Sequence, residues 1–339
     1  MSTTSTLSKR KKMMAWTGVV MLMAIFLLPM TGYISTGFVS AEAEKVQVQE
    51  KQTNPRSDYW RLVRDNAEGY SAVKGRETNE LIQGSGEVWR QLRNGPIATY
   101  GSWLIGFTLA ALALFYMWRG KIELTHPRTG QTIERWSLNE RRMHWLTAGL
   151  FVMLGITGMS LLYGRMVLIP LFGHHGFSTY AEIAKWTHNI LGPVFMVGLL
   201  SMIVSWFKSN FLNKIDWEWF KAFGGMVGDK HPSAGKMNGG EKLWFWALAT
   251  VGVALCLSGL VLDFPNFDQE REIIQISHLV HVVTALILVA FAFGHIYIGT
   301  IGTEGALEGM VTGQVDIAWA EQHHDLWLKA ILNKKSDPP

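Results

Sequence analysis

Continuous apolar runs of about 20 residues recur along the chain, each bounded by polar or charged positions. They cover about residues 13–38, 100–118, 145–163, 183–207, 242–262 and 278–297. A run of this length without interior charges can cross the hydrocarbon core of a bilayer as a single helix. The runs are continuously apolar instead of alternating, which argues against a membrane β-barrel. The pattern therefore predicts an all-α integral membrane protein.

The composition supports this interpretation. Of 339 residues, 48% are hydrophobic and only 17% are charged, and many of the 15 Trp lie at the ends of the apolar runs. Lys and Arg gather beside those runs, so the pI near 9.0 reflects orientation in a membrane and not binding to nucleic acid. The single Cys256 excludes a disulfide, a Cys-ligated zinc site or an iron–sulfur cluster built by this chain alone.

The charges at the ends of the runs predict the order of segments. KRKK at 9–12, an apolar stretch and small residues at 39–43 are typical of a secretory signal peptide or of a retained signal-anchor helix, here residues 1–43. A polar periplasmic segment (44–98), an additional transmembrane helix (99–120) and a cytoplasmic loop (121–143) are expected next. A four-helix transmembrane domain (144–300) and a cytoplasmic tail (301–339) complete the chain. Loops are expected at 164–182 and 208–240.

Four of the 11 His fall within or at the ends of the apolar runs, where a polar side chain is costly and usually functional. His281 and His295 are 14 residues apart, which places them about 21 Å apart along one helix and on the same side of it. The alternation of spans puts His188 at the outer level with His281, and His144 at the inner level with His295. Two imidazoles from facing helices can hold a haem iron and leave it no open position. The sequence thus predicts a di-haem four-helix bundle that carries electrons.

Other residues near these His have weaker cases. Gly155, Gly158 and Gly192 would let a flat macrocycle pack closely, although the first two could equally serve helix–helix contact. His278 competes with His281 for the outer position, but it lies about 100° away from His295 around the helix. It could instead hydrogen-bond a haem propionate or face water. His174 and His175 are expected in a loop, and His231, His323 and His324 are expected to be structural groups on the cytoplasmic side.

Several motifs resemble the gamma subunit of respiratory formate dehydrogenase, a membrane cytochrome b. They are NERRMHW at 139–145, GITGM at 155–159, HNILGPVF at 188–195, GKMNGGEKLWFW at 235–246 and the long stretch from LVHVVTALILVAFAFGHIY to AEQHHDLW at 279–327. The resemblance runs from about residue 135 to the C-terminus, and IQGSGEVWRQLRNGP at 82–96 is similar to longer versions of that subunit. His144, His188, His281 and His295 match the family's four haem-ligand positions.

The resemblance implies two b-type haems and a quinone as electron acceptor in a bacterial inner membrane. Asn238 and Gly240, with His295, match positions that line a quinone site in that family. A structural role explains the first two equally well, with Asn238 capping a helix beside flexible glycines. Glu241 stands where some members of that family have a neutral amide. Its carboxylate could deliver protons or cap the helix. The implied partners are an iron–sulfur beta subunit and a molybdenum or tungsten catalytic alpha subunit on the periplasmic side, with higher oligomers allowed. No catalytic residue is expected in this chain, so it is an enzyme only as part of the complex.

Two alternatives stay open. The cytochrome b subunit of a nickel–iron hydrogenase or a related reductase is built on a similar core. A haem-free transporter or assembly factor with functional intramembrane His is the other, and it leaves the matched depths of the four His unexplained.

Overall fold

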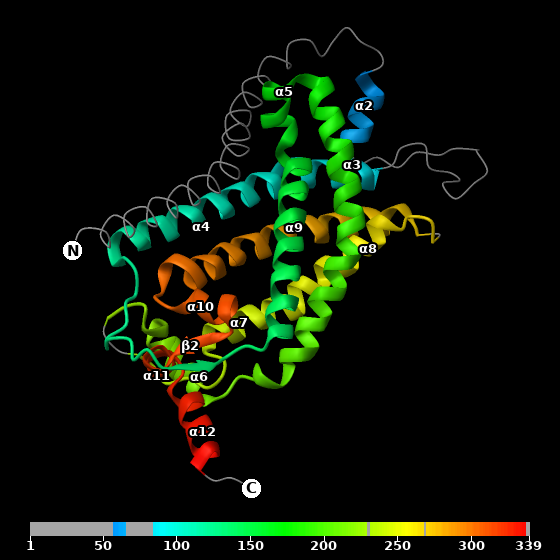
Figure 1. Ribbon diagram of the computed structural model, residues 1–339. Coiled ribbons are helices and arrows are strands. Elements are labelled where there is room, and N and C mark those ends of the chain that lie inside the picture. Colours follow the sequence, from blue (N-terminus) through cyan, green and yellow to red (C-terminus); the bar gives the residue numbers. More distant parts are fainter. Residues whose placement is uncertain (1–56, 66–83, 229–230, 268, 337–339) are drawn as a thin grey trace. The chain divides into compact units, whose positions relative to one another are not determined.

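A computed structural model describes residues 57–65, 84–228, 231–267 and 269–336 of the chain (Figure 1). The expected signal segment at 1–43 lies outside the described residues, as does most of the expected periplasmic segment at 44–98. The short helix α2 (Ser57–Arg64) is described within that segment.

Long apolar helices dominate the structure. Four stretches are long and apolar enough to cross a membrane: Ser85–Arg119, Leu138–Ser209, Gly239–Asp263 and Arg271–Gly302. The first stretch contains α3 (Gly84–Leu92), a π-helical turn (Arg93–Ile97) and α4 (Ala98–Arg119), and the second contains α5 (Leu138–Trp206). The third contains α7 (Gly239–Ala247), a π-helical turn (Leu248–Gly252) and α8 (Val253–Asp263). The fourth contains α9 (Arg271–Tyr297), which continues as the π-helical turn Ile298–Gly302. The prediction of an all-α membrane protein is confirmed.

Helix α5 contains two predicted spans, joined at a sharp reversal at Gly173. The φ of 70° and ψ of 174° at Gly173 are non-helical, and glycine adopts this backbone without the steric penalty of a Cβ atom. The two arms run side by side, because the Oγ1 of Thr157 lies 2.9 Å from His188 Nδ1 and the indole of Trp206 donates to Glu140 at 3.1 Å. The expected loop at 164–182 is therefore wrong, since helical hydrogen bonding continues past the apolar core on both arms up to Gly173.

Short elements occupy the segments between and after the long helices. They are β1 (Thr132–Glu134), α6 (Lys214–Lys221), α10 (Ala306–Thr312), β2 (Gln314–Asp316), α11 (Ile317–His323) and α12 (Asp325–Ser336), with 3-10 turns at Phe207–Ser209 and Phe223–Gly225. Strand β1 pairs antiparallel with β2, with Thr132 opposite Asp316. The loop before α5 and the C-terminal tail are thus joined by a small sheet. Helix α6 lies in the segment 208–240, which was expected to be a loop.

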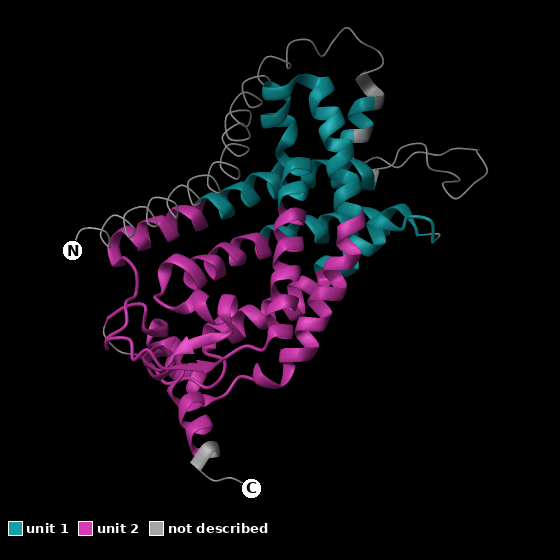
Figure 2. Cartoon of the chain, in the orientation of Figure 1, with its two compact units in different colours: residues 1–106, 156–189, 255–286 teal, residues 107–155, 190–254, 287–339 magenta. Residues whose placement is uncertain are grey.

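The first compact unit comprises residues 1–106, 156–189 and 255–286 (teal in Figure 2). Its core contains the start of α4, where Ala98 and Ile105 are buried. The hydroxyl of the fully buried Tyr163 donates to the carbonyl of Ala98 at 2.9 Å, which ties α5 to α4.

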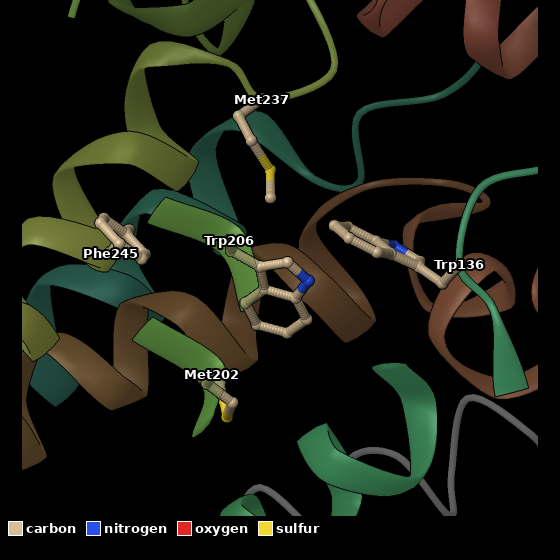
Figure 3. Packing of buried hydrophobic residues seen from close by; sticks show 5 residues of the cluster. All are labelled: Trp136, Met202, Trp206, Met237 and Phe245. Carbon is tan, nitrogen blue, oxygen red and sulfur yellow. The ribbon is translucent and has the colours of Figure 1, made fainter. Parts of the chain in front are cut away.

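The second unit comprises residues 107–155, 190–254 and 287–339 (magenta in Figure 2). Its core includes a cluster of five buried side chains from the β1–α5 connection, α5, the segment before α7 and α7 itself, drawn in Figure 3: Trp136, Met202, Trp206, Met237 and Phe245. A buried ion pair, in which Lys242 Nζ lies 2.8 and 2.9 Å from the Asp216 carboxylate oxygens, fastens α6 to α7. Helix α5 begins at a capping box formed by Ser137 and Glu140, which fixes the start of the arm that carries His144.

Candidate functional site

Two of the predicted histidines face each other in the second unit. His144 lies in the second turn of α5 and His295 in the last turns of α9, and their ring centroids are 6.3 Å apart with an angle of 57° between the planes. The indole of Trp145 meets His144 edge-on at 5.1 Å, and Trp244 stacks on His295 at 5.2 Å and 17°. Aromatic rings from α5 and α7 therefore hold both imidazoles of this inner pair in place.

The other two predicted histidines face each other in the first unit. The ring centroids of His188, on α5, and His281, on α9, are 6.0 Å apart at an angle of 76°. His188 Nδ1 lies 2.9 Å from Thr157 Oγ1, and His281 Nδ1 lies 3.0 Å from the carbonyl oxygen of Leu255. A carbonyl only accepts, so Nδ1 of His281 carries the proton and its Nε2 keeps a lone pair. This is the state in which a histidine binds a metal.

The geometry of both pairs fits a shared iron. A metal–imidazole bond is about 2.0 Å long and the ring centre lies about 1 Å beyond the nitrogen, so two such ligands have centroids about 6 Å apart. The distances of 6.0 and 6.3 Å match this value. His231 and His323 are also 6.1 Å apart, but these two lie outside the apolar spans. The two predicted pairs differ from His231 and His323 because they combine this spacing with positions in facing apolar helices.

Glycine allows the outer rings to approach their neighbouring helices. A Cβ atom at Gly158 would lie 3.1 Å from His188 Cε1, and one at Gly259 would lie 3.0 Å from His281 Cε1. Both distances are shorter than ordinary contacts, so larger residues would displace the rings. Gly158 was named from the sequence but Gly259 was not, although a glycine inside the apolar run at 242–262 could have indicated a close approach of a neighbouring helix. An added Cβ at Gly155 or Gly192 meets no heavy atom within 4 Å, so their packing against a macrocycle stays a prediction.

The structure separates His278 from the outer pair. Its ring lies edge-on to Trp89, with centroids 5.3 Å apart, while His281 is the residue that faces His188. His174 and His175 are exposed at the turn of α5. Among the described residues, no three His, Cys, Asp or Glu gather to hold a metal ion.

Comparison with known proteins identifies the family. The model of the family described as prokaryotic cytochrome b561 matches residues 135–313, which is more than half of the chain and contains both histidine pairs. The chain belongs to the prokaryotic cytochrome b561 family. It is a membrane cytochrome b, and proteins of this kind bind haem b.

This cytochrome b is also similar to curated proteins. It is 28% identical over 204 residues to the formate dehydrogenase cytochrome b556(fdo) subunit of Escherichia coli K12, a match that covers 59% of this chain and 93% of the relative. It is 26% identical over 205 residues to the nitrate-inducible cytochrome b556(Fdn) subunit of the same strain, covering 59% and 91%. It is 27% identical over 201 residues to the formate dehydrogenase cytochrome b556 subunit of Haemophilus influenzae, covering 57% and 82%.

The predicted quinone-site residues of the cytochrome lie at the start of α7. Asn238 is the N-cap: its side chain accepts from the Glu241 backbone N–H at 2.9 Å, and the Glu241 carboxylate accepts from the Asn238 N–H at 2.8 Å. A Cβ atom at Gly240 would lie 2.8 Å from the ring of Trp219. The capping role that was weighed for Asn238 and Glu241 is therefore present in the structure, and Gly240 makes room for Trp219. A quinone near them stays a prediction.

Sequence reasoning missed a buried charged cluster behind Glu241. The Arg135 Nη2 atom donates to Glu241 Oε1 at 3.0 Å, and its Cζ lies 5.2 Å from the ring centroids of Trp136, Trp319 and Trp327. Burial lowers the pKa of Arg135, opposed by the Glu241 carboxylate. No spacing rule brings residues 135, 241 and 319 together, so only the fold could reveal this cluster.

His323 and His324 belong to the same region. His324 Nδ1 donates to the Gly235 carbonyl at 2.7 Å, so its Nε2, 3.0 Å from Arg135 Nη2, accepts from the guanidinium. Burial lowers the pKa of His324 well below its usual value, and that of His323 to about 4. Both rings are neutral at pH 7. Together with the hydrogen bonds of His324, this supports the structural role expected from the sequence.

Proposed function

We propose that this chain is the membrane cytochrome b subunit of a respiratory formate dehydrogenase. It passes electrons from a periplasmic iron–sulfur subunit through two b haems to a quinone on the cytoplasmic side. The observation that carries the proposal is the presence of two facing histidine pairs, His188 with His281 and His144 with His295, with one member of each on α9.

In this function the side chains of the chain would bind the haems and orient the histidine ligands. When bound, each haem b supplies one-electron transfer at its iron. Two histidines would hold each haem, which would leave its iron no open position for oxygen or substrate. Thr157 and the Leu255 carbonyl orient the outer rings through Nδ1, and Trp145 and Trp244 pack against the inner rings. Such contacts fix ligand orientation and tune basicity.

The quinone site is proposed at the start of α7, beside the inner pair. Trp244 stacks on His295, which brings one face of α7 against the inner histidines. Gly240 precedes Trp244 by four residues and therefore shares that face of the helix. Asn238 caps the same end through its oxygen, and an amide also has N–H donors that suit a quinone oxygen. Reduction of the quinone to quinol consumes two electrons and two protons, and uptake of those protons from the cytoplasm charges the membrane.

The partners are proposed from the similar proteins, which are named as subunits of formate dehydrogenases. A molybdenum or tungsten subunit would oxidise formate on the periplasmic side and an iron–sulfur subunit would dock between it and this chain. The positive-inside rule supports the sidedness, because Arg119 and Lys121 lie at the end of α4, beside Ile122, whose N–H donates to Gly302 just after the helix that carries His295. The chain itself then serves as an electron-transfer subunit of an inner-membrane complex.

Haem stoichiometry tests the two-haem part of the proposal. A pyridine haemochrome assay on the purified chain is expected to give two b haems per chain, falling to about one in His281→Ala. His175→Ala, an exposed residue on the outer turn of α5, is the matched control and keeps both. One haem in the wild-type chain would contradict the pairing, and a folded wild-type chain without haem would refute the proposal.

The electron donor is tested separately on the purified complex. Formate is expected to reduce both haems, and a water-soluble quinone analogue to reoxidise them. Reduction by hydrogen instead of formate would favour the nickel–iron hydrogenase alternative, which shares the family and its haem core.

A further inference from the structure

Two polar atoms near the outer histidine pair are buried without a hydrogen-bond partner among the described residues. They are Nε1 of Trp89, on α3, and Nδ1 of His278, on α9. The rings that carry them are in contact, with centroids 5.3 Å apart and planes at 80°. A buried polar group without a partner is destabilising, so two neighbouring groups of this kind indicate a shared partner.

A positive charge accompanies these two groups. Arg93 follows Trp89 by four residues, which places both side chains on one side of the segment, and Arg93 is an electrostatic neighbour of His278. An indole N–H only donates and a guanidinium only donates, and a neutral imidazole supplies one further N–H. Three donors with one net positive charge suit an acceptor-only anion with two oxygens, which is a carboxylate.

The position of His278 indicates which carboxylate is available. His278 precedes the outer histidine His281 by three residues, about one turn or 4.5 Å along α9, and about 60° around it. Haem b carries two propionate carboxylates on its edge. A haem held by His281 therefore offers a carboxylate within a helical turn of the donors on His278, Trp89 and Arg93.

We propose that Trp89, Arg93 and His278 form a carboxylate-binding site that holds a propionate of the outer haem. This inference rests on the proposed function, because it requires a haem on His188 and His281. Trp89 and Arg93 precede residues 135–313, the part of the chain that the family model matches. The segment before the cytochrome core thus completes a cofactor site in that core and does not serve only as a membrane anchor.

The test measures haem release in the full complex. Arg93→Gln and Trp89→Phe each remove a donor, and transfer of haem to excess apomyoglobin is expected to become about tenfold faster for the outer haem only, the size expected for one charge-assisted hydrogen bond. The inner haem of the same chain is the internal control. Arg90→Gln is the matched control variant, since Arg90 lies on the same helix and bonds Glu87 at 2.7 Å. Release at the wild-type rate in both variants would overturn the proposal.

Loading with a modified haem identifies the source of the carboxylate. With the dimethyl ester of haem b, whose propionates are neutral, the wild-type chain is expected to lose the outer haem as fast as Arg93→Gln, and the substitution to have no further effect. If Arg93→Gln still accelerates release with the ester, the anion is a lipid phosphate or a free carboxylate and the proposal is wrong. A wild-type chain that binds no outer haem in either form would instead refute the proposed function itself.

Discussion

At the scale of single residues, the orientation and tautomer of the outer histidine rings depend on their hydrogen-bond partners. His188 reaches Thr157 on the other arm of α5, and His281 reaches a backbone carbonyl of α8. A ligand whose Nδ1–H is held in this way keeps one tautomer and donates more electron density through Nε2. We therefore expect Thr157 to tune the outer pair.

Thr157→Val tests that role. The valine has nearly the same shape but no hydroxyl. A His188 that binds iron through Nε2 carries its proton on Nδ1 and donates it to Thr157 Oγ1, so the substitution removes this acceptor and makes the imidazole a weaker electron donor to iron. We expect the reduction potential of the outer haem to rise while its low-spin absorption spectrum is retained, as measured by redox titration of the purified chain. Thr179→Val, an exposed residue that bonds the His175 carbonyl, is the control. An unchanged potential in Thr157→Val would show that the hydroxyl does not act on the ligand.

The four histidines could be predicted from sequence because membrane depth and helical periodicity are local properties. The choice of His281 over His278 rested on the angle around α9, and the structure places His281 opposite His188. The partners Thr157, Trp244 and Trp89 were missed. Each touches its histidine across a helix–helix contact, and the sequence does not specify which faces of two helices meet.

At the scale of elements, α6 is a short helix that depends on one buried ion pair. The side chains of Lys242 and Asp216 are 5% and 6% exposed, so both charges are removed from water. The hydrophobic pattern gave no sign of α6, because its helical turns are stabilised by the Asn213–Asp216 capping box and by this pair. Short elements fixed by tertiary contacts escape periodicity arguments.

Breaking the pair is expected to be strongly destabilising. Asp216→Leu leaves the Lys242 ammonium buried and uncompensated, which should lower the free energy of unfolding by about 3–5 kcal/mol. Adding Lys242→Met should restore the part of the loss that comes from the uncompensated charge, because an apolar pair of similar volume needs no desolvation, while the capping bond from the Asn213 N–H to Asp216 stays lost. Thermal unfolding in detergent measures both. Glu308→Leu, which breaks the exposed pair with Arg128 at 2.8 Å, is the comparison, and an equal loss there would contradict the burial argument.

The C-terminal helices are expected to respond to acid. The pKa of His323, on α11, is lowered to about 4, mainly by burial and also by the neighbouring charges of His231 and Arg135, while Glu241 opposes the shift. An unfolded histidine titrates near 6.5, so between these values the unfolded state binds more protons. This stability is complete above about pH 6.5 and falls as the pH drops toward 4, by at most about 3 kcal/mol from His323.

Hydrogen exchange of α11 and α12 between pH 7 and pH 4.5 measures this loss. His323→Gln should flatten the pH dependence in part, since the pKa of His324 is lowered as well and contributes with the same sign. The exchange rates of the wild-type chain are corrected for the intrinsic rate. If exchange then becomes slower on acidification, the proposed loss of stability through His323 is wrong.

At the scale of the whole molecule, the proposed function requires one histidine pair in each of the two units and aromatic side chains beside the inner pair. Membrane class, spans and histidine pairs were available from the sequence. The charged cluster around Arg135 and the small sheet of β1 and β2 were not, because they join residues about 100 to 190 positions apart through contacts that no local pattern encodes. What the sequence does not reveal is mainly the surroundings of the proposed quinone site.

Trp244 is the residue that tests that end of the route. It stacks on His295 and shares a face of α7 with Gly240, so a planar quinone ring that approaches the inner haem meets its indole. In the purified complex, Trp244→Ala is expected to raise the KM for a quinone analogue several-fold while formate still reduces both haems at the wild-type rate. Trp118→Ala, an exposed residue at the end of α4, is the control. A shifted potential of the inner haem with an unchanged KM would show that Trp244 only positions His295, and the quinone site would then have to be sought on another face of the inner pair.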